Sequence, residues 1–371
     1  MSCTRELRFN ETVHGITISH DGQRIAVGML RGEVLLLDAC SGKLLTRLDD
    51  GDSFAVSIAF SSACLTPLLL AIGSADGFVR VWDCSSYVCV ARHASLAFNR
   101  VHCVTFSPNG RLLAASSGRT VQLWYTNNWN APPVMLDVGV AWALHVAFSC
   151  DSSLLATNAD SMSLWRIRDE SDVSAVSITN LMREAGDVSS CLAFSPVDRQ
   201  LLACGNDVGN IVLSKVVDRA LVVERDLQGH THCVWSVAFS PCGKQLVSAS
   251  CDKTARLWSV ARGTCLCVLQ GHTWIVFGAY FFHNGKQLAS GSYDDTLRIW
   301  TVCPWNDRVH HLFGAQLKMA VFTLMCVRAR LEQKPWQGQE LRRSSRRAMQ
   351  LPRLPMEVWL LVFEQLALVQ K

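Results

Sequence analysis

The chain has 371 residues and 49% of them are hydrophobic, so it can bury a large core. Its formal net charge of +4 is unevenly spread: residues 317–371 carry ten Lys or Arg and four Glu, which leaves the preceding part near −2. Nucleic-acid binding needs clustered basic charge, so we do not expect the main part of the chain to bind nucleic acid.

The first residues and the cysteines indicate a reducing compartment. The charged residues Arg5, Glu6 and Arg8 interrupt any apolar leader. The sequence contains no run of eighteen apolar residues, so we expect no membrane span. The sixteen cysteines include no Cys-x-x-Cys pair, and the closest two are Cys265 and Cys267. We expect buried free thiols, no metal, no cofactor and a cytoplasmic location, with the nucleus as the alternative.

A repeat of about forty residues organises most of the chain. Residues 235–258 and residues 277–300 align in register, forty-two positions apart. A Gly-His pair precedes each of them, at Gly229-His230 and at Gly271-His272. A repeat of this length, with this punctuation, predicts a propeller or a repeat array. One such ring needs about three hundred residues, so the repeat overrides the two domains that length alone would suggest.

Seven copies of the repeat can be counted. The anchor is a Phe followed about nineteen positions later by a Trp, as in Phe106 and Trp124. In the first and fifth copies, Leu37 and Leu213 replace the Trp. The copies span residues 14–38, 56–83, 102–126, 144–167, 190–216, 235–260 and 277–302.

Each copy predicts three strands followed by a variable fourth. In the sixth copy the first strand is 234–239, and a Pro-Cys-Gly turn follows it, where Gly243 suits a positive φ. The second strand is 246–250, a tight turn surrounds Asp252, and the third strand is 255–258. Alternation with a period of two between turn residues is the expected strand signature, and four strands form one blade.

These motifs resemble the WD-repeat family over about residues 5–303. The resemblance implies an all-β, seven-bladed β-propeller at residues 1–303, and we expect a C-terminal α-helical appendage at residues 304–371. In a closed ring of this kind one strand comes from the opposite end of the chain. Residues 5–9 are expected to supply the outer strand of the last blade, because an unpaired edge invites aggregation.

The resemblance also implies a buried polar network in the two best copies. The two matching sets are His230, Ser248, Asp252 and Trp258, and His272, Ser290, Asp294 and Trp300. A His-Ser-Asp group resembles a hydrolase triad, but it recurs in two blades and lacks a nucleophile elbow. We therefore expect a structural role, no catalytic residue and no enzyme. The second copy keeps only Ser74, Asp76 and Trp82 of this pattern.

Candidate partner-binding residues lie where the first strands begin, at one rim of the ring. They are Trp235 and Phe277, with His14, His102, Leu144 and Ser190 at equivalent positions, and Cys251 and Tyr293 in the second turns. Exposed aromatic side chains at a rim would anchor a partner. The alternative is that Trp235 and Phe277 are half-buried strand residues with no such role.

The C-terminal part predicts two helices joined by a basic stretch. The first is 316–332, and the second follows Leu354 and Pro355. Residues 354–366 resemble the opening helix of an F-box and the last helix of a SOCS-box-type hairpin, both of which dock adaptors of ubiquitin ligases. The candidate docking residues are Leu354, Pro355, Trp359, Leu361 and Phe363.

Both resemblances are partial. Only five residues follow Leu366, whereas an F-box has about three helices, and Arg328 stands where a SOCS box has its Cys after Leu324. The alternative is a helical hairpin that packs on the propeller or on a partner.

The sequence therefore predicts a non-catalytic scaffold that binds protein or peptide partners on the propeller rim. One alternative is a substrate receptor of a cullin-type ubiquitin ligase, which would dock through the C-terminal helices. Another is a scaffold associated with chromatin or RNA.

Overall fold

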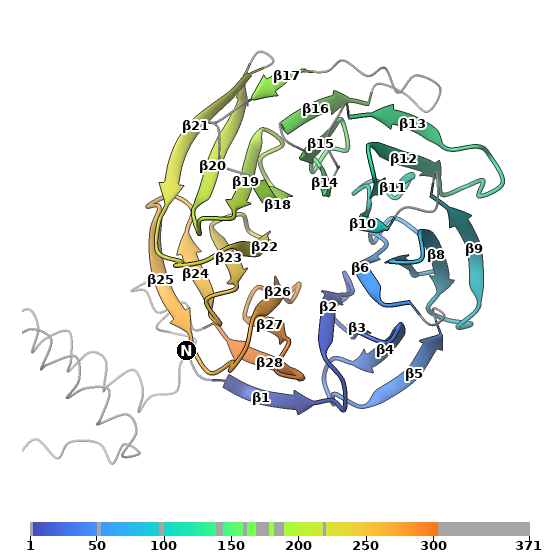
Figure 1. The fold of residues 1–371 in the computed structure, drawn as a ribbon, viewed down its shortest axis with the longest axis horizontal. Coiled ribbons are helices and arrows are strands. Elements are labelled where there is room, and N and C mark those ends of the chain that lie inside the picture. The colour runs from blue at the N-terminus through green and yellow to red at the C-terminus, as the bar shows by residue number, and fades with distance from the viewer. Residues whose placement is uncertain are drawn as a thin grey trace, which may run out of the picture. The chain divides into compact units, whose positions relative to one another are not determined.

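The computed structural model describes residues 3–49, 53–95, 100–138, 144–158, 162–167, 178–181, 189–217 and 220–302. In these residues, seven four-stranded antiparallel sheets are arranged as the blades of a ring (Figure 1). The seven copies and the four strands per blade expected from the repeat are thus confirmed.

Each blade runs outwards from a strand near the centre of the ring. Blade one comprises β2 (Val13–Ile18), β3 (Arg24–Met29), β4 (Glu33–Asp38) and β5 (Leu44–Asp49). Blade two comprises β6 (Ala55–Phe60), β7 (Leu69–Ser74), β8 (Phe78–Asp83) and β9 (Cys89–Ala94). Blade three comprises β10 (Val101–Phe106), β11 (Leu112–Ser117), β12 (Thr120–Tyr125) and β13 (Val134–Asp137). Blade four comprises β14 (His145–Phe148), β15 (Leu154–Asn158), β16 (Met162–Arg166) and β17 (Ile178–Leu181).

The remaining blades follow the same order. Blade five comprises β18 (Ser189–Phe194), β19 (Leu201–Asn206), β20 (Ile211–Val217) and β21 (Ala220–Leu227). Blade six comprises β22 (Val234–Phe239), β23 (Gln245–Ser250), β24 (Ala255–Ser259) and β25 (Thr264–Leu269). Blade seven comprises β26 (Val276–Phe281), β27 (Gln287–Ser292), β28 (Thr296–Thr301) and, as its outer strand, β1 (Cys3–Arg8).

In blades one, three, six and seven the turn between the first two strands contains a glycine with a positive φ. Gly110 and Gly243 have φ angles of 74° and 68°, as the Pro-x-Gly pattern predicts. In the left-handed region a Cβ would meet backbone atoms, so glycine is favoured at both positions. Each turn reverses the chain so that the second strand pairs with the first.

The N-terminal strand closes the ring. β1 pairs antiparallel with β28, and the Thr4 hydroxyl donates to the carbonyl oxygen of Ile299, 295 residues away, at 3.0 Å. Glu6 lies directly opposite Arg298 and forms an ion pair with it at 3.0 Å. Arg5 donates to the carbonyl oxygen of Cys40 in blade one. The expected closing strand is confirmed, and it joins blade seven to blade one.

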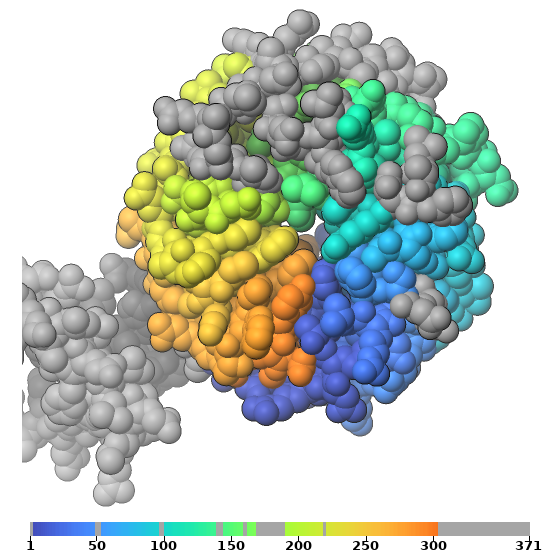
Figure 2. All heavy atoms as spheres, viewed as in Figure 1, coloured from blue at the N-terminus to red at the C-terminus, as the bar shows by residue number. Residues whose placement is uncertain are grey.

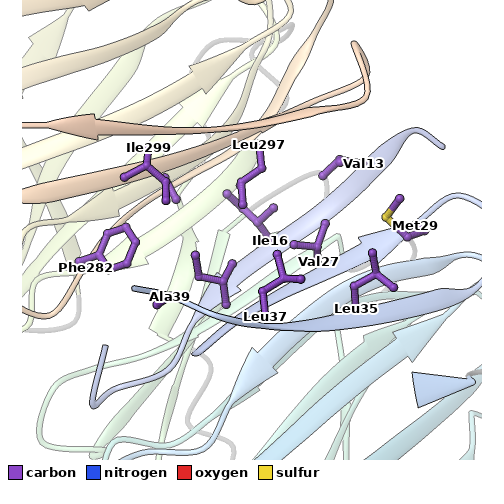
Figure 3. Close-up of a cluster of buried hydrophobic side chains, with 12 residues drawn as sticks. Val13, Ile16, Val27, Met29, Leu35, Leu37, Ala39, Phe282, Leu297 and Ile299 are labelled. Atoms are coloured by element: carbon purple, nitrogen blue, oxygen red, sulfur yellow. The ribbon is translucent and has the colours of Figure 1, made fainter. Parts of the chain in front are cut away.

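The hydrophobic core lies between neighbouring blades. In Figure 3, Val27 and Leu37 of blade one face Leu297 and Ile299 of blade seven. Similar buried clusters fill the other blade-to-blade contacts. Full burial of one such side chain stabilises the fold by about 1.5–3 kcal/mol. Degenerate blades are therefore held by their neighbours, as in other repeat proteins.

Glycine in the second strand of some blades lets the next blade approach. Neither Gly73 of β7 nor Gly15 of β2 has a positive φ. A Cβ on Gly73 would lie only 2.5 Å from Cγ1 of Val101 and 2.8 Å from Cγ1 of Val104, both in blade three. A Cβ on Gly15 would lie 3.6 Å from Cδ1 of Ile58, which is ordinary contact. Alanine at Gly73 therefore tests the close packing of blades, whereas alanine at Gly15 tests only the loss of a glycine from a strand.

Gly73→Ala should destabilise the propeller, because the new methyl group overlaps two branched side chains that cannot swing away. We expect the free energy of unfolding to fall by about 1–3 kcal/mol. The control Gly15→Ala should be neutral or stabilise by up to about 1 kcal/mol. Chemical denaturation of both variants measures the difference, and equal stabilities would contradict the account of blade packing.

Other expectations meet the structure only in part. In the described residues no helix is long and apolar enough to span a membrane, and no cluster of three or more His, Cys, Asp or Glu could hold a metal ion. The fourteen cysteines described are free, but only Cys84, Cys191 and Cys204 are buried as expected, and six others are half-buried. The expectation is wrong for five that are exposed: Cys3, Cys40, Cys64, Cys242 and Cys265. These five lie in turns or outer strands, where no further layer covers them.

The expected C-terminal elements lie outside the described residues, which end at residue 302. The domain boundary near residue 303, the helix at 316–332 and the five candidate docking residues therefore stay predictions.

Candidate functional site

A β-bulge recurs where the innermost strands begin. In six of these strands the register shifts by one residue immediately after the first pair. Such a bulge leaves one residue unpaired and changes the direction of its side chain. The unpaired residues are His14, Val56, His102, Ser190, Trp235 and Phe277. Leu144 stands at the same place in blade four, directly before β14.

These bulges lie at one end of the central channel, which we call the channel mouth. The innermost strands surround the axis of the ring, and all of them start at the same end of their blades (Figure 1). All the rim positions expected from the sequence coincide with bulges except Leu144, since the pairing of β14 with β15 shows no register shift. Val56 belongs to the same set as the bulged residues, but the sequence reasoning missed it.

Four rings form a continuous row across the mouth, which we call the aromatic row: Trp235, Phe277, His14 and Phe54. The ring centroids of Trp235 and Phe277 are 5.3 Å apart, and those of Phe277 and His14 are 4.5 Å apart. His14 and Phe54 follow at 5.2 Å. The row thus crosses blades six, seven, one and two. His14 is buried, whereas the other three rings stay partly exposed.

The second turns add two residues to this row. Tyr293 stacks on Phe277 at 5.7 Å with an interplanar angle of 9°. The indole N–H of Trp235 donates to Sγ of Cys251 at 2.7 Å. The sequence analysis expected Cys251 and Tyr293 to lie near Trp235 and Phe277. The structure places these four side chains in contact with one another. The aromatic contacts also orient the rings, since such pairs have preferred geometries.

The other side of the mouth carries basic and histidine side chains. The Cζ of Arg100 lies 4.9 Å from the centroid of the Phe54 ring. Burial, and then the charge of Arg100, lowers the pKa of His14 to about 4 and also lowers the pKa of His102. Burial, and then His102, lowers the pKa of His145 to about 4. All three histidines are therefore neutral at pH 7, and Arg100 carries the charge.

Sequence reasoning missed Phe54, Arg100 and His145. Phe54 and Arg100 each stand two positions before a bulged residue, Val56 and His102. That fixed offset is the signal that could have revealed them. Of the predicted rim positions, Ser190 has a structural use, because its hydroxyl donates to the carbonyl oxygen of Val234 at 2.7 Å.

The innermost strand of blade seven carries a tyrosine where the other innermost strands have small residues. Tyr280 lies in β26, and a Cβ on Gly278 would meet its ring at 3.1 Å. Burial raises the pKa of Tyr280, while a hydrogen bond with Ser236 opposes the shift. The equivalent residues of the other innermost strands are small: Thr17, Ala59, Thr105, Ala147, Ala193 and Ala238. The space-filling view shows a narrow opening at the centre of the ring (Figure 2).

The polar network is formed in blade six. The indole N–H of Trp258 donates to Oγ of Ser248 at 2.8 Å, and that hydroxyl lies 2.7 Å from Nε2 of His230. Nδ1 of His230 lies 2.7 Å from Oδ2 of Asp252. Since the hydroxyl donates to Nε2, His230 is neutral and its Nδ1–H donates to Asp252. Thr254 donates to the other carboxylate oxygen at 2.6 Å.

Blade seven repeats this arrangement with nearly the same distances. Nδ1 of His272 lies 2.9 Å from Asp294, and Nε2 lies 2.8 Å from Ser290. The indole N–H of Trp300 donates to Ser290 at 2.8 Å. The side chains of His230 and His272 have 0% exposure. The networks therefore hold strands together inside each blade, and their hydroxyls cannot be reached by a substrate.

Electrostatics support the neutral histidine. Burial lowers the pKa of His230, which disfavours its protonated form. Burial alone would raise the pKa of Asp252, but hydrogen bonds from His230 and Thr254 outweigh it and hold this pKa below its usual range. The pair is a neutral imidazole that donates to a carboxylate, a charge-assisted hydrogen bond.

Other blades use substitutes for the network. In blade two Arg80 forms an ion pair with Asp76 at 2.6 Å. In blade four the indole N–H of Trp165 donates to Oγ1 of Thr157 at 3.0 Å. Blade four thus retains the Trp and the residue that accepts from it without the Gly-His pair, whereas the buried Nε1 of Trp82 in blade two has no hydrogen-bond partner.

Asp252→Ala should destabilise the propeller, because it leaves the buried Nδ1–H of His230 without an acceptor. We expect the free energy of unfolding to fall by about 1–3 kcal/mol. Trp258 should keep its hydrogen bond, since it donates to Ser248 and not to the carboxylate. Equilibrium denaturation measures the change. The matched control is Asp207→Ala in the exposed turn of blade five, and an equal effect of both variants would show that the network contributes nothing.

Four segments of the chain match a known family of repeats. Residues 42–83, 90–125, 222–259 and 263–301 match the family described as WD domain, G-beta repeat. Together with the seven closed blades, these repeats define a WD40-repeat propeller.

Several curated proteins are similar to part of this chain. Apoptotic protease-activating factor 1 of Danio rerio is 30% identical over 256 residues, which cover 67% of this chain and 19% of that protein. Nuclear distribution protein PAC1-2 of Uncinocarpus reesii is 40% identical over 197 residues, 53% of this chain and 36% of that protein. Target of rapamycin complex subunit wat1 of Schizosaccharomyces pombe is 27% identical over 236 residues, 52% of this chain and 74% of that protein. The chain thus spans only a fifth of the first of these relatives.

Proposed function

We propose that this chain is a non-catalytic interaction scaffold that binds a protein or peptide segment at the channel mouth. The observation that carries the proposal is the aromatic row, whose members come from four blades. Trp235 and Phe277 project from bulges and remain partly exposed. Large aromatic side chains clustered at the centre of a surface are typical anchors of a binding partner.

The comparisons support a general interaction role. One similar protein is by its name a subunit of a target of rapamycin complex, and its match covers most of its own length. WD40-repeat propellers typically serve as platforms for other proteins, and the networks of blades six and seven are too buried to act on a substrate.

The rival interpretation is that the aromatic row only fills the inner edge of the ring. A side chain used only for packing would be buried, as His14 is, with 4% of its surface exposed. Tyr293, Phe54 and the two bulged aromatic residues keep accessible surface instead. Binding and packing therefore make different predictions for substitutions at these positions.

Docking to a cullin-type ubiquitin ligase stays a prediction about residues 354–366, outside the described part of the chain. A scaffold role with chromatin or RNA stays a second prediction, and the charge near −2 of the ring region does not favour it. The cytoplasmic or nuclear location is likewise a prediction.

The test is affinity purification of the full chain followed by mass spectrometry. Trp235→Ala combined with Phe277→Ala should remove a reproducible set of partners, because loss of an aromatic anchor typically weakens binding by about 2 kcal/mol or more. The thermal midpoint of the variant should be measured in parallel to show that the ring is intact.

The matched control is Val222→Ala combined with Val223→Ala. These residues lie on β21 at the outer edge of blade five and are 51% and 50% exposed. The control should keep all partners. If the aromatic pair keeps the full set while the control loses members of it, binding takes place on the outer edge and the proposal is wrong.

A further inference from the structure

We propose that the channel mouth selects a peptide segment that presents a side-chain carboxylate beside an apolar side chain, and that Arg100 binds the carboxylate. This inference rests on the proposed function and adds the chemistry of the partner. It follows from the place of Arg100, from the charge of its neighbours and from the aromatic row beside it.

Arg100 is a half-buried cation without a counter-charge in the described part of the chain. Its guanidinium lies over the Phe54 ring, 4.9 Å from the centroid. No described carboxylate lies within ion-pair distance of it, and its buried Nε has no hydrogen-bond partner. The described arginine ion pairs are all formed by other arginines, as in the pair of Arg80 with Asp76.

The groups that surround Arg100 do not neutralise it. Burial, and then the charge of Arg100, lowers the pKa values of His14 and His102, so both rings are neutral. Tyr293 is close enough to interact with Arg100, but burial raises the pKa of Tyr293, which therefore stays protonated. Burial also lowers the pKa of Arg100 itself, which shows that partial desolvation already disfavours the cation.

An uncompensated cation in a partly dry site favours an anionic partner. Removing a charge from water is unfavourable unless it is paired, and a carboxylate can accept two parallel hydrogen bonds from one guanidinium. Binding of such a group would pair the charge of Arg100 through the terminal guanidinium nitrogens, which are not among its buried atoms. The neutral histidines could then accept or donate further hydrogen bonds.

A basic partner fits less well, although aromatic rings can bind cations. Arg100 already covers one face of Phe54, and its charge would repel a second cation nearby. The remaining rings, Trp235, Phe277 and Tyr293, are stacked on one another and partly exposed. They offer contact area for an apolar side chain within a few residues of the carboxylate.

The experiment uses the full chain and a library of fluorescein-labelled octapeptides with amidated C-termini. Fluorescence polarisation should show enrichment of Asp or Glu at one position, with an apolar residue close to it. The tightest Glu peptide and its Gln counterpart are then compared. We expect the Glu peptide to bind at least tenfold more tightly to the wild-type protein.

Arg100→Gln should make the affinities of the Glu and Gln peptides equal within about twofold, and it should leave the thermal midpoint unchanged or raised. The matched control Arg262→Gln removes an exposed arginine from the turn between β24 and β25 and should keep the tenfold preference. A preference that survives in Arg100→Gln overturns the inference. The inference is also overturned if the amidated peptides do not bind and the same peptides bind only when they are made with free C-terminal carboxylates.

The aromatic variant separates this inference from the proposed function. If Trp235→Ala with Phe277→Ala abolishes peptide binding while Glu and Gln peptides bind the wild type equally, the proposed function stands and the inference is wrong. If no peptide responds to either the aromatic or the Arg100 substitution, both are wrong.

Discussion

Pairing of β1 with β28 is the constraint on which the rest of the structure depends. It joins residues 295 positions apart and covers the outer edge of the last blade. The ion pair between Glu6 and Arg298 strengthens that pairing, and Arg5 continues the connection into blade one. A closed ring then fixes seven innermost strands around one axis. Only in that arrangement do residues as distant as Phe54 and Phe277 meet His14.

Stability and binding use different parts of each blade. The networks of His230 and His272 are fully enclosed and hold the two most regular repeats together, whereas the weaker repeats depend on packing between blades. The bulges at the strand starts leave side chains that the sheets do not use. The channel mouth therefore combines aromatic area with one unpaired cation, Arg100, without disturbing the cores.

The repeat made most of the fold predictable, because regular anchors such as Phe106 and Trp124 place every blade in register. The polar contacts of His230 were implied by the resemblance to the WD-repeat family, because all the matching residues lie within a single repeat. The contact between Arg100 and Phe54 could not be inferred, because it joins two neighbouring blades through residues that precede a strand, although the shared offset from a bulged residue marks both positions. The exposure of Cys265 in β25 was also unpredictable, since a small apolar side chain carries no clear preference for one face of a strand.

Amide hydrogen exchange of the full chain, read by mass spectrometry, tests ring closure most directly. The comparison is between β28 in blade seven and its counterpart β24 in blade six, each the third strand of a regular repeat. Closure by β1 predicts equal protection of the two strands, because both are paired on two sides. Exchange of the β28 amides that is orders of magnitude faster than that of the β24 amides would show an open edge and contradict the account.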